Sequence, residues 1–89
     1  MASAATITIR YFAAFREAMG VAEILVALPD GVGNISGLVS WIVAEHPHAA
    51  ACLADRARVH IAVNNVLASA DSAITAGDVV DVFPPVSGG

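Results

Sequence analysis

The sequence predicts an α+β fold in which a mixed β-sheet packs against one main helix. Apolar residues alternate with a period of two in several short segments, one segment between them has helical spacing, and turn-forming residues separate the segments. The chain has 89 residues, enough for one domain of ordinary size. Because 57% of the residues are hydrophobic and only 13% are charged, a packed core is expected rather than a disordered chain.

The first two strands are predicted on either side of a short helical connection. Residues Thr6 to Phe12 alternate in polarity. One face of this strand carries Ile7, Ile9 and Tyr11. Residues Ala13 to Gly20 are predicted to contain a turn of helix, and residues Ala22 to Leu28 repeat the strand pattern. The inward residues of this second strand are Ile24, Val26 and Leu28. The two strands are expected to pair as a hairpin with a long loop.

One amphipathic helix is predicted after this hairpin. Pro29-Asp30-Gly31 supplies turn chemistry, and Asn34 is a suitable N-cap because its side chain accepts hydrogen bonds from a first helical turn. The apolar stripe of the helix consists of Ile35, Leu38, Val39, Ile42 and Val43. Pro47 ends the segment, because proline lacks the N–H that continues a helix. An Ala-rich stretch of ambiguous structure follows.

The remaining strands follow the same reasoning. Residues Arg58 to Asn64 alternate, and one side of this strand carries Val59, Ile61 and Val63. Asn64-Asn65 is predicted to form a tight turn into a short return strand, because Asn tolerates positive φ. A last strand covers Val79 to Phe83 and points Val80 and Val82 to one face. Strand, strand, helix, strand, strand is the order of the β-grasp fold of ubiquitin, so one such domain is expected over residues 1–83.

Charge and cysteine content narrow the partners and the compartment. Four Arg are outnumbered by eight acidic residues, and the net charge of −4 disfavours nucleic acid because phosphate binding needs clustered positive charge. No apolar stretch approaches the roughly 20 residues that span a bilayer, and no signal-peptide pattern precedes Thr6. A lone Cys52 forms no internal disulfide. We expect a cytoplasmic protein without nucleic-acid or membrane partners.

No pattern in the chain is typical of an independent enzyme. It has no Ser-His-Asp order, no Gly-rich phosphate loop and no paired carboxylates. His46 and His48 have a spacing that suits a metal, but histidines at a helix C-terminus more often face the helix dipole or solvent, so no metal is assigned. Cys52 is interpreted as a small apolar residue rather than as a persulfide nucleophile.

The segment 84–89 is predicted to be a flexible, extended tail. Two prolines directly after the last strand prevent further ladder pairing and favour extended geometry. At about 3.3 Å per residue, six residues from Pro84 to Gly89 reach about 20 Å, enough to place a terminus in another protein's active site. Gly88 and Gly89 have no side chains and suit a narrow channel. A frayed terminus without function is the alternative.

Two sequence blocks resemble the small subunit of molybdopterin synthase, in the MoaD/ThiS group of ubiquitin-like sulfur carriers. The first block is the ending from Phe83 to Gly89, together with Gly77-Asp78 and Val63-Asn64. The second block is Tyr11–Glu17 followed by Gly20, which is similar to that subunit's Phe-Ala-x-x-Arg-Glu-x-x-Gly pattern. The two blocks together span most of the chain.

The resemblance implies a chemistry at the C-terminus. A ubiquitin-activating-like adenylyltransferase would use ATP to adenylate the Gly89 carboxylate, and a sulfur donor protein would supply the sulfur of a thiocarboxylate. The tail would then insert into the large subunit of molybdopterin synthase through Pro84, Pro85, Val86, Ser87 and Gly88. There the thiocarboxylate would give its sulfur to cyclic pyranopterin monophosphate.

The resemblance also implies a division of labour between subunits. Two small and two large subunits form a heterotetramer in the enzyme that the chain resembles. Catalytic side chains and pterin recognition are expected on the large subunit. This chain is therefore expected to be a sulfur-donating subunit that is no enzyme alone and binds no cofactor.

A partner surface is expected on the sheet. Phe12 and Phe83 fall on the strand face opposite the residues that face the helix, where polar residues are usual. The resemblance implies that Phe12, Arg16, Leu67 and Phe83 contact the large subunit. The alternative is that both phenylalanines pack over loops of their own domain.

Three other functions are left open by the sequence. The same carrier chemistry serves other acceptors, in thiamine synthesis, cysteine synthesis or tRNA thiolation. A ubiquitin-like protein modifier would instead join its activated Gly89 to lysines of target proteins. A simple interaction module would have an inert tail.

Overall fold

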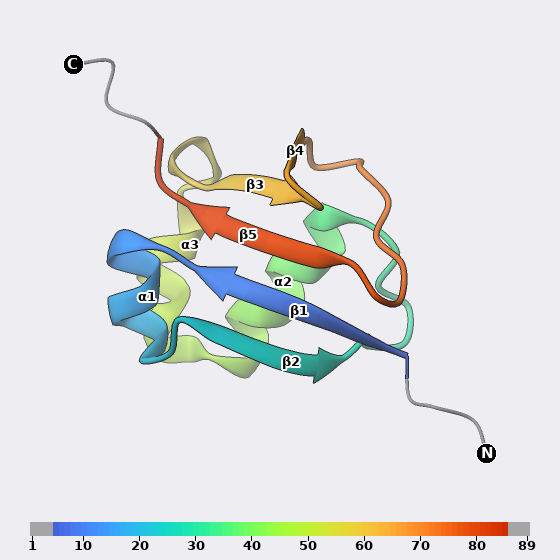
Figure 1. Cartoon of the computed structure of the whole chain (residues 1–89). Coiled ribbons are helices and arrows are strands. Elements are labelled where there is room, and N and C mark those ends of the chain that lie inside the picture. Colours follow the sequence, from blue (N-terminus) through green and yellow to red (C-terminus); the bar gives the residue numbers. More distant parts are fainter. Residues whose placement is uncertain (1–4, 86–89) are drawn as a thin grey trace.

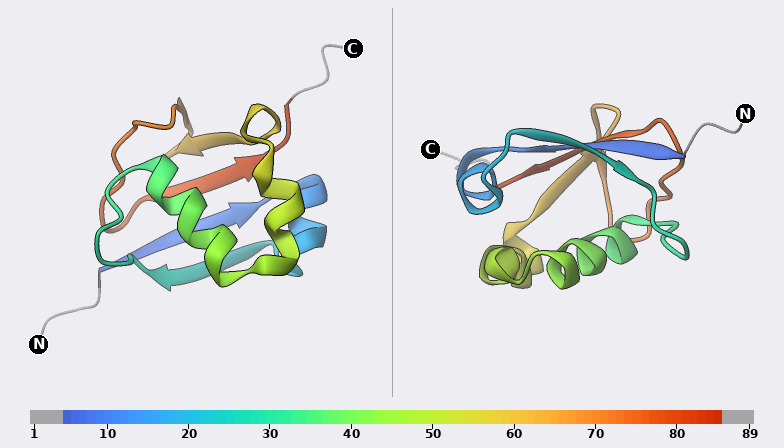
Figure 2. Two further views of the ribbon diagram at one scale, coloured as in Figure 1. Left: turned by 180° about the vertical axis from the view of Figure 1, so that it is seen from behind. Right: turned by 90° about the horizontal axis from the view of Figure 1, so that it is seen from below.

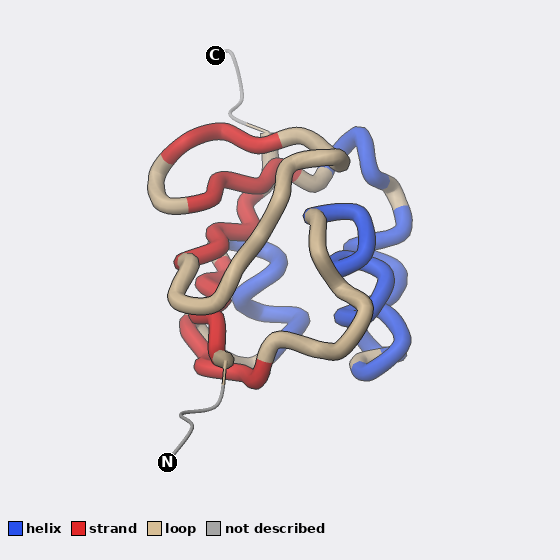
Figure 3. The backbone as a smooth tube through the Cα atoms, turned by 90° about the vertical axis from the view of Figure 1, so that its right-hand side faces the viewer, coloured by secondary structure: helices blue, strands red, loops and turns tan. Residues whose placement is uncertain are grey.

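The computed structural model describes residues 5–85 and has two layers, a sheet and a set of helices (Figure 1; Figure 3). The sheet contains β1 (Thr6–Tyr11), β2 (Glu23–Ala27), β3 (His60–Val63), β4 (Val66–Ala68) and β5 (Val79–Phe83). The helices are α1 (Ala13–Met19), α2 (Ile35–Glu45) and α3 (Ala50–Ala54), with short 3₁₀ turns η1 (Pro47–Ala49) and η2 (Arg56–Arg58). The predicted α+β class, a mixed sheet against one main helix, is confirmed.

The strands lie in the order β2-β1-β5-β3-β4 across the sheet. β1 pairs antiparallel with β2, which confirms the predicted hairpin, and α1 lies in its long connection. β1 pairs parallel with β5, and β5 pairs antiparallel with β3. The parallel register joins Tyr11 to Val82, so the chain segments that follow these two residues leave the sheet at the same end. This topology places Phe12 beside the root of the C-terminal segment.

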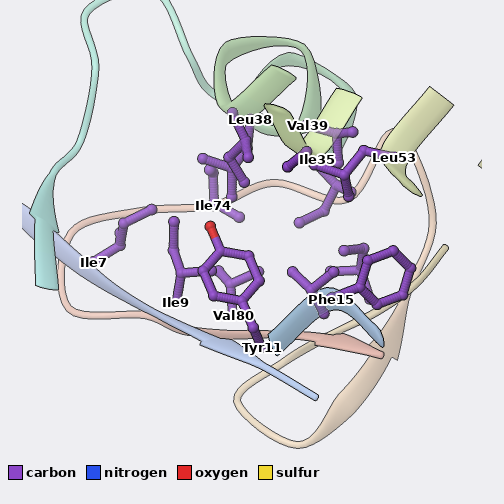
Figure 4. Packing of buried hydrophobic residues seen from close by; sticks show 14 residues of the cluster. Ile7, Ile9, Tyr11, Phe15, Ile35, Leu38, Val39, Leu53, Ile74 and Val80 are labelled. Atoms are coloured by element: carbon purple, nitrogen blue, oxygen red, sulfur yellow. The ribbon is translucent and has the colours of Figure 1, made fainter. Parts of the chain in front are cut away.

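The core lies between the sheet and α2 (Figure 4). The alternating residues of β1 and β5 that were predicted to face inward are all buried: Ile7, Ile9, Tyr11, Val80 and Val82. Four residues of the predicted helical stripe meet them: Ile35, Leu38, Val39 and Ile42. Full burial of one large aliphatic side chain contributes about 1.5–3 kcal/mol, so these facing rows are the main source of stability. Burial also raises the pKa of the Tyr11 hydroxyl to about 12.

Helix α2 begins and ends where the sequence predicts. The Asn34 side chain accepts a hydrogen bond from the Gly37 N–H at 2.8 Å, which satisfies a free donor of the first turn. A Cβ at position 37 would lie 3.2 Å from that Asn34 oxygen, so glycine leaves room for the cap. The helix ends at Glu45, before Pro47.

The predicted direction of Ile24 is confirmed, but its burial is incomplete, and the third strand is shorter than predicted. Ile24 points to the helix side of the sheet but stays 36% exposed, because β2 is an edge strand. The third strand begins at His60 rather than at Arg58, because η2 (Arg56–Arg58) occupies the three residues before Val59. The ambiguous Ala-rich stretch forms η1 and α3, which bury Ala49 and Leu53 against the core.

Candidate functional site

The candidate site lies on the sheet face away from α2, which we call the outer face (Figure 2). No described helix covers this face. The strand registers place one row of residues across it from edge to edge: Glu23, Arg10, Asp81, Ala62 and Leu67. An uncovered sheet face that carries large apolar side chains is a common form of protein interaction surface.

Phe12 and Phe83 lie next to this row, at the end of the sheet where β5 finishes. Together with Asp81, Pro84 and Pro85 they line an open hollow of about 410 Å³. Phe12 is 41% exposed and Phe83 is half-buried, with the His60 ring packed edge-on against it at 5.8 Å. Phe12 is therefore not covered by loops of its own domain, whereas Phe83 is partly covered by a neighbouring strand.

The backbone after β1 holds Phe12 in this position. Phe12 has an extended conformation, and Ala13 follows with φ of 52°, a left-handed value that residues other than glycine seldom adopt. The Phe12 N–H donates to the Val82 carbonyl at 3.0 Å. The chain thus turns sharply into α1 while Phe12 stays tied to β5, and strain of this kind tends to occur at functional sites.

Leu67 and Arg16 lie outside the hollow. Leu67 is 69% exposed on β4 and belongs to the outer-face row, opposite Ala62. Arg16 is exposed in the last turn of α1 and does not line the hollow. The structure therefore brings together Phe12, Phe83 and the two prolines, places Leu67 further along the same face and sets Arg16 apart. Contact of these residues with a partner stays a prediction.

An ion pair at the centre of the outer face was missed in the sequence. Arg10 Nε donates to Asp81 Oδ1 at 2.6 Å, and Arg10 Nη2 donates to Asp81 Oδ2 at 2.8 Å. This two-pronged geometry suits guanidinium and carboxylate. The hydrogen bonds that Arg10 donates to Asp81, followed by the negative charge of Asp81, raise the pKa of Arg10. The guanidinium also lies over the Phe12 ring, 5.7 Å from its centre. Alternation already placed both residues on one face, but only the strand order shows that they are neighbours.

The residues at the other end of β5 that carried the resemblance have a structural role. Asn64 and Asn65 form the predicted turn with φ of 51° and 69°. The Asn64 amide donates to Asp78 at 2.9 Å and accepts from the Val79 N–H at 2.9 Å. The Thr75 N–H also donates to Asp78, at 2.8 Å. These bonds fix where β5 begins, and thereby where it ends beside the hollow.

The root of the predicted tail is visible at the hollow. Pro84 is half-buried, Pro85 is exposed, and neither has an N–H for further sheet pairing. Val86, Ser87, Gly88 and Gly89 lie outside the described residues. The described part of the chain thus ends at Pro85, in the lining of the hollow that Phe12 and Phe83 share.

Three other features bear on function. Within residues 5–85 no three His, Cys, Asp or Glu side chains are grouped so as to hold a metal, and the His46 and His48 rings meet edge-on at 5.7 Å. Cys52 is half-buried against the core. In the same range, every helix is too short or too polar to cross a bilayer.

The fold defines the class, and comparison with known proteins defines the family. A β-grasp sheet with one main helix is shared with the ubiquitin-like sulfur carriers. Residues 9–89 match the ThiS family, and the chain belongs to that family. No curated protein matches the sequence.

Solved structures agree with this assignment. A Pyrococcus furiosus protein that carries the name of molybdopterin converting factor subunit 1 is 34% identical, with a TM-score of 0.75, over 94% of this chain and 100% of that one. Small archaeal modifier protein 1 of Haloferax volcanii is 27% identical, with a TM-score of 0.77, over 94% and 99%. Subunit 1 of molybdopterin-converting factor from Helicobacter pylori, in complex with subunit 2, is similar in fold at 21% identity, with a TM-score of 0.61, over 94% and 99%.

Proposed function

We propose that this chain is the sulfur carrier subunit of molybdopterin synthase and that Gly89 carries the sulfur. The observation behind the proposal is the aromatic hollow at the root of the tail, which offers a docking surface where the segment 86–89 departs. The family match runs through to Gly89, and a relative at 34% identity is named for molybdopterin converting factor. The coarser assignment, a ubiquitin-like sulfur carrier, holds whichever acceptor receives the sulfur.

The proposed chemistry takes place at the terminal carboxylate. A carboxylate is a poor electrophile, so a separate adenylyltransferase joins it to AMP from ATP and releases pyrophosphate. The outer sulfur of a persulfide on a donor protein then attacks the carbonyl carbon and displaces AMP, which gives an acyl disulfide. A thiol reduces the S–S bond of this acyl disulfide, so that the terminus becomes a thiocarboxylate and the thiol ends in a disulfide with the donor. Cyclic pyranopterin monophosphate receives this sulfur in the large subunit. The chain itself contributes reach and access, because Pro84 and Pro85 keep the tail off the sheet and Gly88 and Gly89 leave the carbonyl carbon uncrowded.

The outer face serves as the docking surface in this proposal. Phe12 and Phe83 provide aromatic anchors beside the tail, and Leu67 extends the contact along the same face. Arg16 contacts the partner from α1. The Helicobacter pylori protein is found in a complex of subunits 1 and 2. By analogy, the proposed assembly of this chain is a heterotetramer of two small and two large subunits.

One observation favours a second function, conjugation to target proteins. The Haloferax volcanii relative is named a modifier protein and is similar over nearly its whole length. A modifier also needs an activated terminal glycine, but its acyl group ends on a lysine amine instead of on sulfur. The two functions therefore share activation and differ only in the acceptor. Sulfur transfer for thiamine, cysteine or tRNA differs in the acceptor alone.

Intact mass spectrometry tests the proposal. The chain is incubated with ATP, an adenylyltransferase and a sulfur donor, beside a matched variant that lacks Gly89, and fragmentation locates any change. Oxygen-to-sulfur exchange confined to Gly89 is expected, and localisation separates it from methionine oxidation, which has nearly the same mass. The sulfurated chain should then convert the pterin precursor to molybdopterin with the large subunit. Exchange without conversion would leave a carrier with another acceptor, and lysine-linked conjugates in cell lysate would favour the modifier.

A further inference from the structure

The Arg10–Asp81 pair leaves most of the Arg10 donors unused. A guanidinium has about five N–H donors, and Asp81 accepts only two of them, one from Nε and one from Nη2. The Arg10 side chain is 37% exposed, whereas Asp81 as a whole residue is 8% exposed. Asp81 therefore acts as a buried anchor, and the unused side of the guanidinium faces out of the sheet.

The surroundings of Arg10 supply no other acceptor for these donors. Glu23 lies opposite on β2 and attracts Arg10 through its charge, but it forms no ion pair with Arg10 within 4.0 Å. On the β5 side, Asp81 already accepts two hydrogen bonds from Arg10. The Phe12 ring lies against the guanidinium with its face and has no oxygen or nitrogen that could accept another. Among the described residues no further side chain or backbone group accepts from Arg10. Solvent satisfies the remaining N–H groups as long as the outer face is open.

A partner that covers the outer face removes this solvent. A desolvated guanidinium donor without an acceptor is costly, because the charged group loses its hydration and gains nothing. The partner surface must therefore provide an acceptor opposite Arg10. Arg is also among the residues that dominate the energy of protein interfaces, for the same reason.

The local charges indicate what kind of acceptor fits. Glu23 and Asp81 flank Arg10 in one row, so the three side chains together carry one negative charge, in a chain of net charge −4. A partner carboxylate at this point would meet two carboxylates for one guanidinium. A neutral carbonyl oxygen accepts the same hydrogen bonds without that repulsion.

We propose that Arg10, positioned by Asp81, is a specificity-determining residue that requires a neutral carbonyl acceptor on the large-subunit surface covering the outer face. The inference rests on the proposed function, since it concerns the same docking surface. Arg10 thus adds selectivity to the affinity that the apolar residues provide. A partner with an apolar or acidic surface opposite Arg10 binds poorly.

Exchange of the two charges tests the proposal. In the double variant Arg10→Asp/Asp81→Arg an ion pair between β1 and β5 is kept. The guanidinium and its unused N–H donors now lie on β5, and a carboxylate replaces them on β1. Binding to the molybdopterin synthase large subunit from the same organism is measured by titration calorimetry, with thermal unfolding of each variant in parallel. We expect the dissociation constant to rise about 10- to 100-fold, the range for loss of hydrogen bonds to a charged group. The matched control Glu45→Gln changes an exposed carboxylate at the end of α2, on the other side of the sheet, and should bind within about twofold of the wild type.

The outcomes separate this inference from the function beneath it. Equal binding of the exchanged variant and the wild type would overturn the role of Arg10 and leave the proposed function intact. If the affinity difference between the exchanged variant and the wild type disappears as salt is raised from about 0.05 M to about 0.5 M, the acceptor is acidic and the neutral acceptor is overturned. Failure of the wild type itself to bind would overturn both. If the exchanged variant does not fold, Arg10→Leu/Asp81→Leu removes both charges without leaving one buried, and the same rise is expected.

Discussion

Two polar clusters lie along β5, one at its start and one at its centre, and the chain satisfies their hydrogen bonds to different degrees. At its start, Asp78 accepts from the Thr75 N–H and the Asn64 amide, while Asn64 in turn accepts from the Val79 N–H. At its centre, Asp81 accepts from two N–H groups of Arg10, and the rest of the guanidinium is open to solvent. In the first cluster both side-chain groups, of Asp78 and Asn64, are hydrogen-bonded within the chain, whereas the second cluster keeps N–H donors and two aromatic rings available.

Along the five residues of β5, the residues that stabilise the fold are therefore different from those available to bind a partner. The start of β5 is bonded to the β3–β4 turn, so changes there should affect folding. The end of β5 borders an open hollow between Phe12 and Phe83, so changes there should affect binding. The following predictions test that separation, from the largest expected effect to the smallest.

Phe83→Asp should weaken binding to the large subunit most. The change places a charge in the hollow where an aromatic ring would be desolvated, and truncation or polar replacement of an aromatic anchor costs about 2–4 kcal/mol, which is a rise of about 30- to 1000-fold in the dissociation constant. Calorimetric titration measures it. Phe12→Asp provides a second, more exposed position. An unchanged dissociation constant in both variants would remove the hollow from the interface.

Asn64→Ala should lower stability and leave binding unaffected. The variant loses the hydrogen bonds to Asp78 and from Val79, and alanine adopts the φ of 51° less readily than asparagine. Together these effects should reduce the free energy of unfolding by about 1–3 kcal/mol in urea denaturation. A weaker affinity for the large subunit at full folding would contradict the separation of the two ends.

Asp78→Asn should reveal a pH dependence. The Thr75 N–H, followed by the Asn64 amide, stabilises the charged carboxylate and lowers the pKa of Asp78 from its usual 3.8. A carboxyl group with a lower pKa in the folded state stabilises the fold above the unfolded pKa, and this contribution is lost as pH falls through the folded pKa. The stability difference between wild type and variant should be constant near neutral pH and shrink below about pH 4. Urea denaturation from pH 7 to pH 3 measures it, and a difference that does not change with pH would contradict the charge argument.

His60→Ala should have the smallest effect. The edge-on contact of the His60 ring with Phe83 is worth about 0.5–1.5 kcal/mol at most, and both rings remain partly open to solvent. A modest drop in thermal stability and a change in affinity of no more than a few-fold are expected. A loss as large as that of Phe83→Asp would place His60 among the anchors instead.

The fold could be predicted where tertiary packing agrees with a simple period. β1 and β5 are central strands buried on one face by α2, so their alternation matches the observed burial. For Ile24 the same rule gave the correct direction but not the extent of burial, because alternation does not show whether a helix covers an edge strand. The segment 47–58 could not be assigned, since alanine fits both helix and loop and the burial of Leu53 depends on distant residues.

The candidate site could be predicted only in part for a related reason. The outer position of Phe12 and Phe83 follows from strand alternation. The Arg10–Asp81 pair joins residues 71 apart in sequence, and it exists because β1 and β5 pair in parallel. Nothing local in either strand indicates that partner. The segment 86–89, where the proposed chemistry occurs, lies outside the described residues.

The central place of β5 has a consequence for synthesis of the protein on the ribosome. Among the strands of residues 5–85, β5 comes last in the sequence, yet it lies between β1 and β3. Without it the β1–β2 hairpin and the β3–β4 hairpin share no strand pairing. The five-stranded sheet cannot form until residues 79–83 have left the ribosome. A chain interrupted earlier therefore exposes its apolar faces and is a candidate for degradation. Any chain that folds well enough to present the hollow has already been translated to Pro84, where the tail begins.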